Sequence, residues 1–148
     1  MLTKKDIEEI AIRELKKYQL STKITFFKYR EFKKKAMSSP IIRQSIKEGN
    51  KLEELNIPAL ISHKTNTIYL SLETIQRLLQ EEPLSLQKRF IQAIIIHEIF
   101  HLHSTKKNNI NNFNTALRIE EETSKEFKKH YPGLAALGKR ICKKYISR

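Results

Sequence analysis

The sequence contains little cysteine and no long apolar run, and both absences limit where the protein can act. Its one cysteine, Cys142, cannot form a disulfide within the chain, which indicates a reducing compartment. Residues 1–17 are charged throughout and lack the apolar centre of a signal peptide. The longest fully apolar runs, such as residues 93–96, are far too short to span a bilayer. We therefore expect a soluble, cytoplasmic protein that does not enter a membrane.

The 148 residues are enough for one domain with a substantial core. Hydrophobic residues make up 39% of the chain, so the composition is not that of a disordered segment. We expect residues 1–148 to form a single domain.

Positive charge is concentrated in the two flanks of the chain, and the formal net charge is +13. Residues 1–50 carry 13 basic and 6 acidic groups, residues 51–122 carry 8 and 9, and residues 123–148 carry 8 and 1. Such flanks can attract nucleic acid, anionic lipid or an acidic protein, although a soluble lysine-rich surface is the simpler explanation. No recognised nucleic-acid-binding motif accompanies the charge, which favours the simpler explanation.

Hydrophobic periodicity and capping residues predict an α+β fold. Thr3, with Asp6 three residues later, forms a capping pattern for a helix over about 4–18. Residues 59–72 contain two β-prone runs around the polar KTNT, which predicts a β-hairpin. The other predicted elements are a strand over 23–29, a helix from Ser39-Pro40 to Gly49-Asn50, a short helix from Ser71 that ends before Pro83, a helix from Ser85 to about Ser104, an Asn-rich loop over 108–114, a helix over about 115–130 stopped by Pro132-Gly133, and a basic helix over 134–146.

The run IIIHEIFHLHS, residues 94–104, places three histidines and a glutamate in an otherwise apolar segment. His97, Glu98 and His101 form the pattern H-E-x-x-H, and on a helix the first and last of them lie on one face. Two imidazoles at this spacing can bind one zinc ion, and the adjacent glutamate can reach water on that metal. His103 lies about 200° further round the helix than His101, so it is not expected to bind the same metal.

The alternative interpretation of this motif is a pair of core histidines bonded to backbone or carboxylate groups. The predicted helix is apolar on every side, as its residues Ile91, Ile94, Ile95, Ile96, Ile99 and Leu102 indicate. Such a helix is buried, so the alternative must also explain a buried glutamate beside the first histidine. We therefore favour a site for one zinc ion per chain.

A zinc site of this kind requires a third protein ligand, and residues 116–127 offer several glutamates. The inward stripe of the predicted helix consists of Ala116, Ile119, Thr123, Phe127 and Tyr131. Glu120 falls within this stripe, where a carboxylate needs a partner such as zinc. We therefore expect Glu120 to be the third ligand. The alternatives are Glu121, Glu122, Glu126 and His130, or a helix whose glutamates are all solvated or paired with Arg118 and the lysines.

These residues resemble the gluzincin metallopeptidases, which join H-E-x-x-H on one helix to a glutamate on a later helix. The likeness is closer to the ImmA/IrrE-type peptidases and the single-domain minigluzincins, and it covers about residues 58–128. As in those families, a hairpin strand, TIYLSL, is followed by Lys88-Arg89-Phe90 and then by the H-E-x-x-H helix. The segment Glu120-Glu121-Glu122-Thr123-Ser124 resembles their later E-x-E-A-[ND] pattern, whose first glutamate binds the metal. Ile99-Phe100 stands where those families often have Leu-Gly.

The resemblance implies a zincin-like domain and a zinc-dependent endopeptidase acting on protein or peptide substrates. His97, His101 and Glu120 would then bind the zinc ion, and Glu98 would be the general base. The strand TIYLSL, residues 67–72, is expected to offer an edge along which an extended substrate adds.

Four further residues lie outside these assignments. Tyr131 and His130 are candidates, by position alone, for stabilising the oxyanion. Cys142, in the basic C-terminal segment 134–148, is either a small core residue or a ligand that keeps the enzyme latent, as in some minigluzincins. His63 is expected to be a solvent-facing strand residue.

A second interpretation belongs to another functional class. The protein would be a catalytically inactive, zincin-like binding module whose basic flanks hold nucleic acid or a regulatory protein. Glu98 distinguishes the two, because a peptidase requires this carboxylate whereas a structural zinc site does not.

Overall fold

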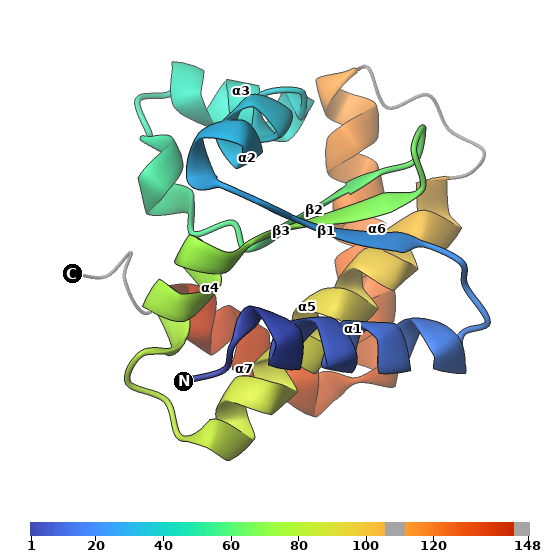
Figure 1. The fold of residues 1–148 in the computed structure, drawn as a ribbon. Coiled ribbons are helices and arrows are strands. Elements are labelled where there is room, and N and C mark those ends of the chain that lie inside the picture. Colours follow the sequence, from blue (N-terminus) through green and yellow to red (C-terminus); the bar gives the residue numbers. More distant parts are fainter. Residues whose placement is uncertain (106–111, 144–148) are drawn as a thin grey trace.

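The computed structural model describes residues 1–105 and 112–143, which form helices around a small sheet (Figure 1). The helices are α1 (Lys4–Lys17), α2 (Tyr29–Ala36), α3 (Pro40–Lys47), α4 (Leu72–Leu79), α5 (Leu84–Thr105), α6 (Phe113–His130) and α7 (Pro132–Lys143), with a short 3-10 helix, η1 (Leu52–Leu55). The strands are β1 (Lys23–Phe27), β2 (Ala59–Ser62) and β3 (Thr67–Ser71). This architecture confirms the predicted α+β class.

Several helices begin at the capping residues that the sequence indicates. The backbone N–H of Asp6 donates to Thr3 Oγ1 at 3.2 Å, and that of Thr3 donates to Asp6 Oδ2 at 2.9 Å. These reciprocal bonds are a capping box. Ser39 and Ser71 accept in the same way from the first turns of α3 and α4. The local sequence therefore determines where these three helices start.

The three strands are arranged in the order β1-β3-β2. The predicted hairpin is present, because β2 pairs antiparallel with β3 and Leu60 lies opposite Tyr69. However, β1 pairs parallel with β3, with Ile24 opposite Ile68. The expectation of a small antiparallel sheet is therefore corrected to a mixed sheet. The parallel pair requires a long crossover, which α2 and α3 supply between β1 and the hairpin.

The central position of β3 contradicts one prediction. The segment 67–72 was expected to offer a free edge to a substrate, but β3 lies between β1 and β2 and all of its residues are buried. Its backbone groups pair with a neighbouring strand on each side. The sheet edges within the described part of the chain are instead β1 and β2.

Helix α2 was not predicted from the sequence. The strand expected over 23–29 ends at Phe27, and α2 begins at Tyr29. Lys28 occupies the N-cap position and makes no capping bond with its side chain, so the usual start signal is absent. The helix buries only Phe32 and Ala36, and it therefore depends on tertiary packing more than on its own sequence.

Two other boundaries differ from expectation. The Asn-rich segment 108–114 was predicted as a loop, but Asn112 caps α6 and accepts from the N–H of Asn114 at 2.7 Å, so the helix begins at Phe113. The rest of that segment lies outside the described residues.

Helix α7 begins at Pro132, because proline is tolerated in the first turn of a helix. Its expected end at residue 146 also lies outside the described residues.

Helix α5 is the central element of the fold. It packs against α1, α6, α7 and β2, and Figure 1 shows it beneath the sheet, with α2 and α3 on the other side. The largest buried side chains are Phe90, Ile7, Ile68, Leu70, Ile75, Leu78, Leu79, Ile91, Ile95, Ile99 and Ile141. The helix that carries H-E-x-x-H is therefore held on several sides by the core.

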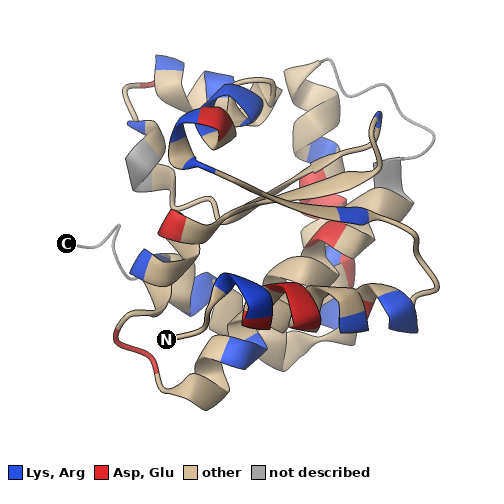
Figure 2. Ribbon diagram, in the orientation of Figure 1, with Lys and Arg blue, Asp and Glu red and all other residues tan. Residues whose placement is uncertain are grey.

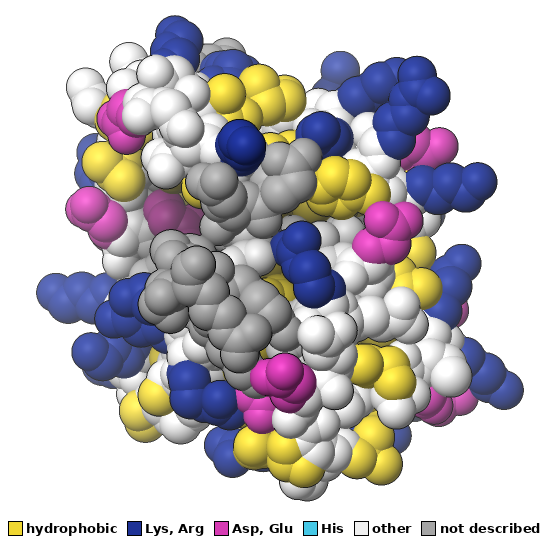
Figure 3. Space-filling model, turned by 90° about the vertical axis from the view of Figure 1, so that its left-hand side faces the viewer, with side chains coloured by type: hydrophobic (Ala, Val, Ile, Leu, Met, Phe, Trp, Pro, Cys, Tyr) yellow, Lys and Arg dark blue, Asp and Glu magenta, His cyan; other side chains and the backbone are white. Residues whose placement is uncertain are grey.

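The surface is rich in basic side chains. On the face in Figure 3, Lys and Arg side chains project around the margin and hydrophobic side chains lie in small, separate areas. No histidine of the described chain is visible on this face. Among the described helices, none is long and apolar enough to cross a membrane.

Candidate metal centre

Three side chains from two helices meet at the surface between α5 and α6. His101 Nε2 lies 2.7 Å from Glu120 Oε2, and His97 Nε2 lies 3.6 Å from Glu120 Oε1. One ligand atom from each of the three residues lies within 4.8 Å of the other two. The structure therefore brings together the three residues that the sequence nominated, and they could hold a metal ion.

The two histidines are positioned by their helix and by an aromatic layer behind them. They are one turn apart on α5, and their rings are 4.9 Å apart between centroids. The ring of His97 lies 5.5 Å from that of Phe127 on α6, and Phe100 makes an edge contact with Phe127 at 5.8 Å. The bulky Phe100 thus packs α5 onto α6.

Glu120 is held from its own helix as well as by the histidines. Ser124 Oγ donates to Glu120 Oε1 at 3.4 Å, one turn along α6. The neighbouring Glu121 and Glu122 are exposed and are not part of the cluster. Helical phase separates them, because Ile119 and Thr123 face the core and only Glu120 among the three points toward α5.

The pKa values of the two histidines in the cluster are shifted in opposite directions. Burial and the charge of His101 lower the pKa of His97 to about 4, so His97 is neutral at pH 7. Burial would also lower the pKa of His101, but the hydrogen bond to Glu120 and the negative charges of Glu98 and Glu120 together raise it above its usual value. Burial would raise the pKa of Glu120, but the hydrogen bond and charge of His101 hold it below its usual value. The contact between His101 and Glu120 therefore favours the charged form of each, whereas burial favours the neutral form of His97.

Glu98 lies next to the cluster but outside it. Its residue surface is only 8% exposed, and burial raises the pKa of its carboxyl to about 7. The negative charge of Glu120 acts in the same direction, whereas His101 opposes it. A carboxyl group with this pKa can both accept and donate a proton near neutral pH.

The surroundings of His97 Nε2 indicate whether a metal ion fits between the three side chains. His97 Nε2 is buried and has no hydrogen-bond partner among the described residues. Its distance from Glu120 Oε1, 3.6 Å, is too long for a hydrogen bond. A buried polar atom without a partner is unfavourable, and a neutral imidazole nitrogen is a metal ligand. Two imidazoles and one carboxylate are also a donor set that suits zinc. The residues present therefore fit a divalent metal of this type.

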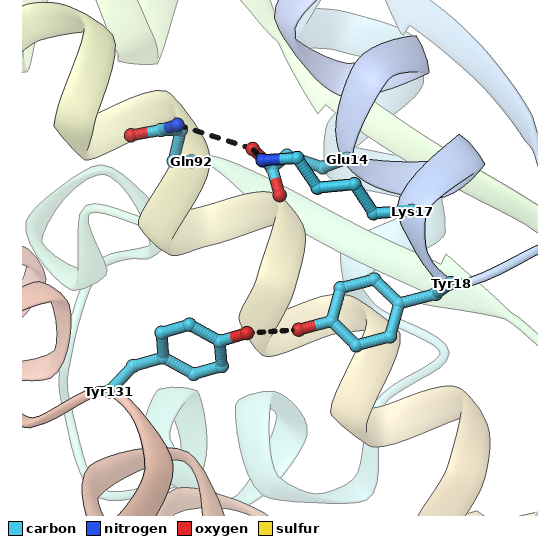
Figure 4. Close-up of polar contacts among 5 residues, drawn as sticks. All are labelled: Glu14, Lys17, Tyr18, Gln92 and Tyr131. Atoms are coloured by element: carbon cyan, nitrogen blue, oxygen red, sulfur yellow. Dashed lines mark hydrogen bonds and ion pairs between the residues drawn. The ribbon is translucent and has the colours of Figure 1, made fainter.

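The other nominated residues lie outside the cluster. Tyr131 Oη and Tyr18 Oη are hydrogen-bonded to each other, which joins the end of α6 to the end of α1 (Figure 4). His130 is exposed and lies 3.4 Å from Glu126 on the same helix. His103 is exposed, as expected from its helical phase. In the described part of the chain, the polar partners of Tyr131 and His130 are therefore Tyr18 and Glu126.

Cys142 lies on α7 and packs against the main hydrophobic core. Burial raises the pKa of its thiol to about 11. It is not part of the ligand cluster in the described chain. These observations favour the core role over that of a latent ligand.

The sequence did not identify His63 as a residue near the centre. It was expected on the solvent-facing side of a strand, but it lies half-buried in the turn between β2 and β3. Burial and the charge of His101 lower the pKa of His63, so the two imidazoles are within electrostatic reach. Local sequence carries no signal for this, because the packing of β2 on α5 brings the turn close.

Comparisons with known proteins do not classify the chain. No protein-family model, curated protein or solved structure matches it. The functional interpretation therefore depends on the geometry described above.

Proposed function

We propose that the protein is a zinc-dependent endopeptidase of the gluzincin type with a zincin-like fold. The observation that carries this proposal is the convergence of His97, His101 and Glu120, with a buried, unpartnered Nε2 on His97. The buried Glu98 adds the carboxyl group that peptide hydrolysis requires beside such ligands. The resemblance of residues 58–128 to ImmA/IrrE-type peptidases and minigluzincins supports the same assignment.

The chemistry divides between the ligands and Glu98. A zinc ion held by His97, His101 and Glu120 would lower the pKa of a water molecule and polarise the carbonyl group of the substrate. Glu98 accepts a proton from the attacking water and then donates it to the amine nitrogen that leaves. Burial raises the pKa of Glu98 in the metal-free chain, which favours proton transfer by this carboxyl near neutral pH. His97 remains neutral and can therefore act as a ligand.

The sheet suggests where an extended substrate would lie. β2 is an edge strand, and it packs against α5, which carries both histidines. A peptide that paired with the free edge of β2 would use backbone hydrogen bonds and would run close to the H-E-x-x-H helix. We therefore propose β2, in place of residues 67–72, as the strand along which a substrate adds.

Metal content is the test of the ligand set. We expect about one zinc ion per wild-type chain and its loss from Glu120→Ala. Glu121→Ala is the matched control, because its side chain is exposed on the same helix and should leave the metal in place. Metal retained by Glu120→Ala, or lost equally from both variants, would contradict the ligand assignment.

Glu98→Gln separates a peptidase from a binding module. The variant should keep its zinc and its fold while losing cleavage of an unfolded protein substrate by at least about 100-fold. A wild-type protein that binds zinc but cleaves no more than Glu98→Gln would overturn the peptidase and favour the inactive zincin-like module.

A further inference from the structure

Helices α2 and α3 present a strongly positive surface, which we call the α2–α3 basic surface. Its basic side chains are all exposed and are Lys28, Arg30, Lys33, Lys34, Lys35, Arg43 and Lys47. The segment 28–47 contains one acidic residue, Glu31. Figure 2 shows the Lys and Arg positions on these two helices.

Stability of α2 explains only part of this charge, namely the lysines of its last turn, Lys33, Lys34 and Lys35. Lysines near the C-terminal end of a helix are favourable, but Lys28 occupies the N-cap position and Arg30 lies in the first turn. Positive charge at that end opposes the helix dipole, and Lys28 makes no side-chain capping bond. Serine, aspartate or glutamate would stabilise the helix better at these positions.

Two of these charges also have no ion-pair partner in the described part of the chain. Among the described residues, the ion pairs with carboxylates include none to Arg30 or Lys34. Lys35 Nζ lies 5.3 Å from the ring centroid of Tyr69, so an aromatic face stabilises this ammonium group. α2 buries Phe32 on one side, and Arg30 and Lys34 are on the opposite side, one turn apart.

The surface is connected to the candidate metal centre through α3. α3 packs against α6, the helix of Glu120, and Figure 1 shows the N-terminal end of α6 next to α3. α2 packs on β1 and β3. A polypeptide that extends from the metal centre along α6 toward its N-terminal end therefore reaches the basic surface.

We propose that the α2–α3 basic surface binds an acidic segment of the polypeptide substrate and so selects acidic polypeptides for the metal centre. The inference rests on the proposed peptidase function. Charge complementarity identifies the partner, and α3 connects the surface to the helix that carries the third ligand.

A polypeptide fits this surface better than a single-stranded nucleic acid. Surfaces that bind single strands interleave exposed aromatic rings with basic groups, so that bases can stack. Here Phe32 is buried, and Tyr29 is half-buried with Lys33 Nζ 5.6 Å from its ring centroid. Within residues 28–47 the exposed large hydrophobic side chain is Met37, which offers no stacking face. The exposed ring of Phe113 begins α6 and is a single aromatic group, not an interleaved set.

The experiment compares two variants that each lose three positive charges, one on α2 and one on α6. Binding of a labelled, unstructured peptide rich in glutamate is measured by fluorescence anisotropy in the Glu98→Gln background, so that the peptide is not cleaved. The variant R30Q/K33Q/K34Q removes three charges from α2, and K125Q/K128Q/K129Q removes three from exposed positions of α6. We expect at least about tenfold weaker binding in the α2 variant and less than about twofold in the α6 variant.

A second measurement covers the case in which the α2 variant is unfolded by circular dichroism. K47Q on α3 then replaces it, with an expected loss of about twofold to threefold, and K125Q is its control. A peptide with glutamine in place of every glutamate should bind at least about tenfold more weakly than the acidic peptide.

Three results would overturn the inference. Equal losses in the α2 and α6 variants would show a general charge effect, and equal binding of the two peptides would remove the selectivity. Tighter binding of a single-stranded DNA of the same length, lost in the α2 variant, would make the surface a nucleic-acid site. The two proposals can fail separately. Binding of the acidic peptide at α2 without its cleavage by the wild-type protein would overturn the peptidase function alone. Cleavage of both peptides at the same rate would overturn the selection of acidic substrates alone.

Discussion

His101 Nε2 lies 2.7 Å from Glu120 Oε2, and this contact joins α5 to α6 at a point where His97 Nε2 has no hydrogen-bond partner among the described residues. A metal ion held by His97, His101 and Glu120 would satisfy the unpartnered nitrogen of His97. Because only the folded chain brings the three ligands together, binding should stabilise the fold.

We therefore predict that zinc at about 100 times its dissociation constant raises the free energy of unfolding by about 2.7 kcal/mol. His97→Ala should abolish this increase. His103→Ala is the matched control, because this histidine is exposed on the same helix and should retain the increase. Thermal unfolding with and without zinc measures the effect, and an equal shift in wild type and His97→Ala would argue against the site.

The buried carboxyl of Glu98 predicts a pH dependence of the metal-free protein. Burial raises the pKa of Glu98 from 4.5 to about 7, so the folded state binds a proton that the unfolded state lacks between these values. Stability is therefore lost as the pH rises through 7, by an amount on the order of 3 kcal/mol. Glu98→Gln has no charge to bury, so its advantage over wild type should be larger at pH 8 than at pH 4.5. Urea unfolding at the two pH values measures the difference, and an advantage that did not change with pH would contradict the burial of a titrating carboxyl.

The bond between Tyr18 and Tyr131 predicts a structural role for both phenols. Tyr131→Phe should reduce the free energy of unfolding by about 1 kcal/mol, because Tyr18 then loses its partner. Tyr18→Phe should have a similar effect, and the double variant should lose little more than either single one. Metal content and kcat should stay close to wild type. A fall in kcat of about 100-fold in Tyr131→Phe alone would instead assign this residue to the oxyanion.

The thiol of Cys142 is predicted to be unreactive in the folded protein. Burial raises its pKa to about 11 from an ordinary 9.0, which leaves about 100-fold less thiolate near pH 8. Alkylation should therefore be slow in buffer and fast in denaturant. Cys142→Ala should leave zinc content and cleavage unchanged. A rise in activity in this variant would support the latent-ligand alternative.

Sequence patterns predicted the parts of the structure that depend on local chemistry. The capping box at Thr3 and the spacing of His97 and His101 follow from helix geometry, and helical phase was enough to choose Glu120 over its neighbours. These features need no knowledge of what packs against the helix.

The parts that were missed depend on contacts distant in sequence. The parallel pairing of β1 with β3 removes the free edge expected for residues 67–72. The unpredicted α2 has a lysine at its N-cap and buries little of its own surface. The place of His63 near His101 results from packing of the hairpin on α5. Such features are decided by tertiary packing, which overrides local preference.

The order of the ligands along the chain has a consequence for the timing of activity. His97 and His101 lie on α5, but Glu120 belongs to the following helix, α6. A growing polypeptide would therefore carry two of the three ligands before the third had been synthesised. Under the proposed function, hydrolysis would begin only after α6 had folded back onto α5, so the nascent protein would be protected from its own active site during translation.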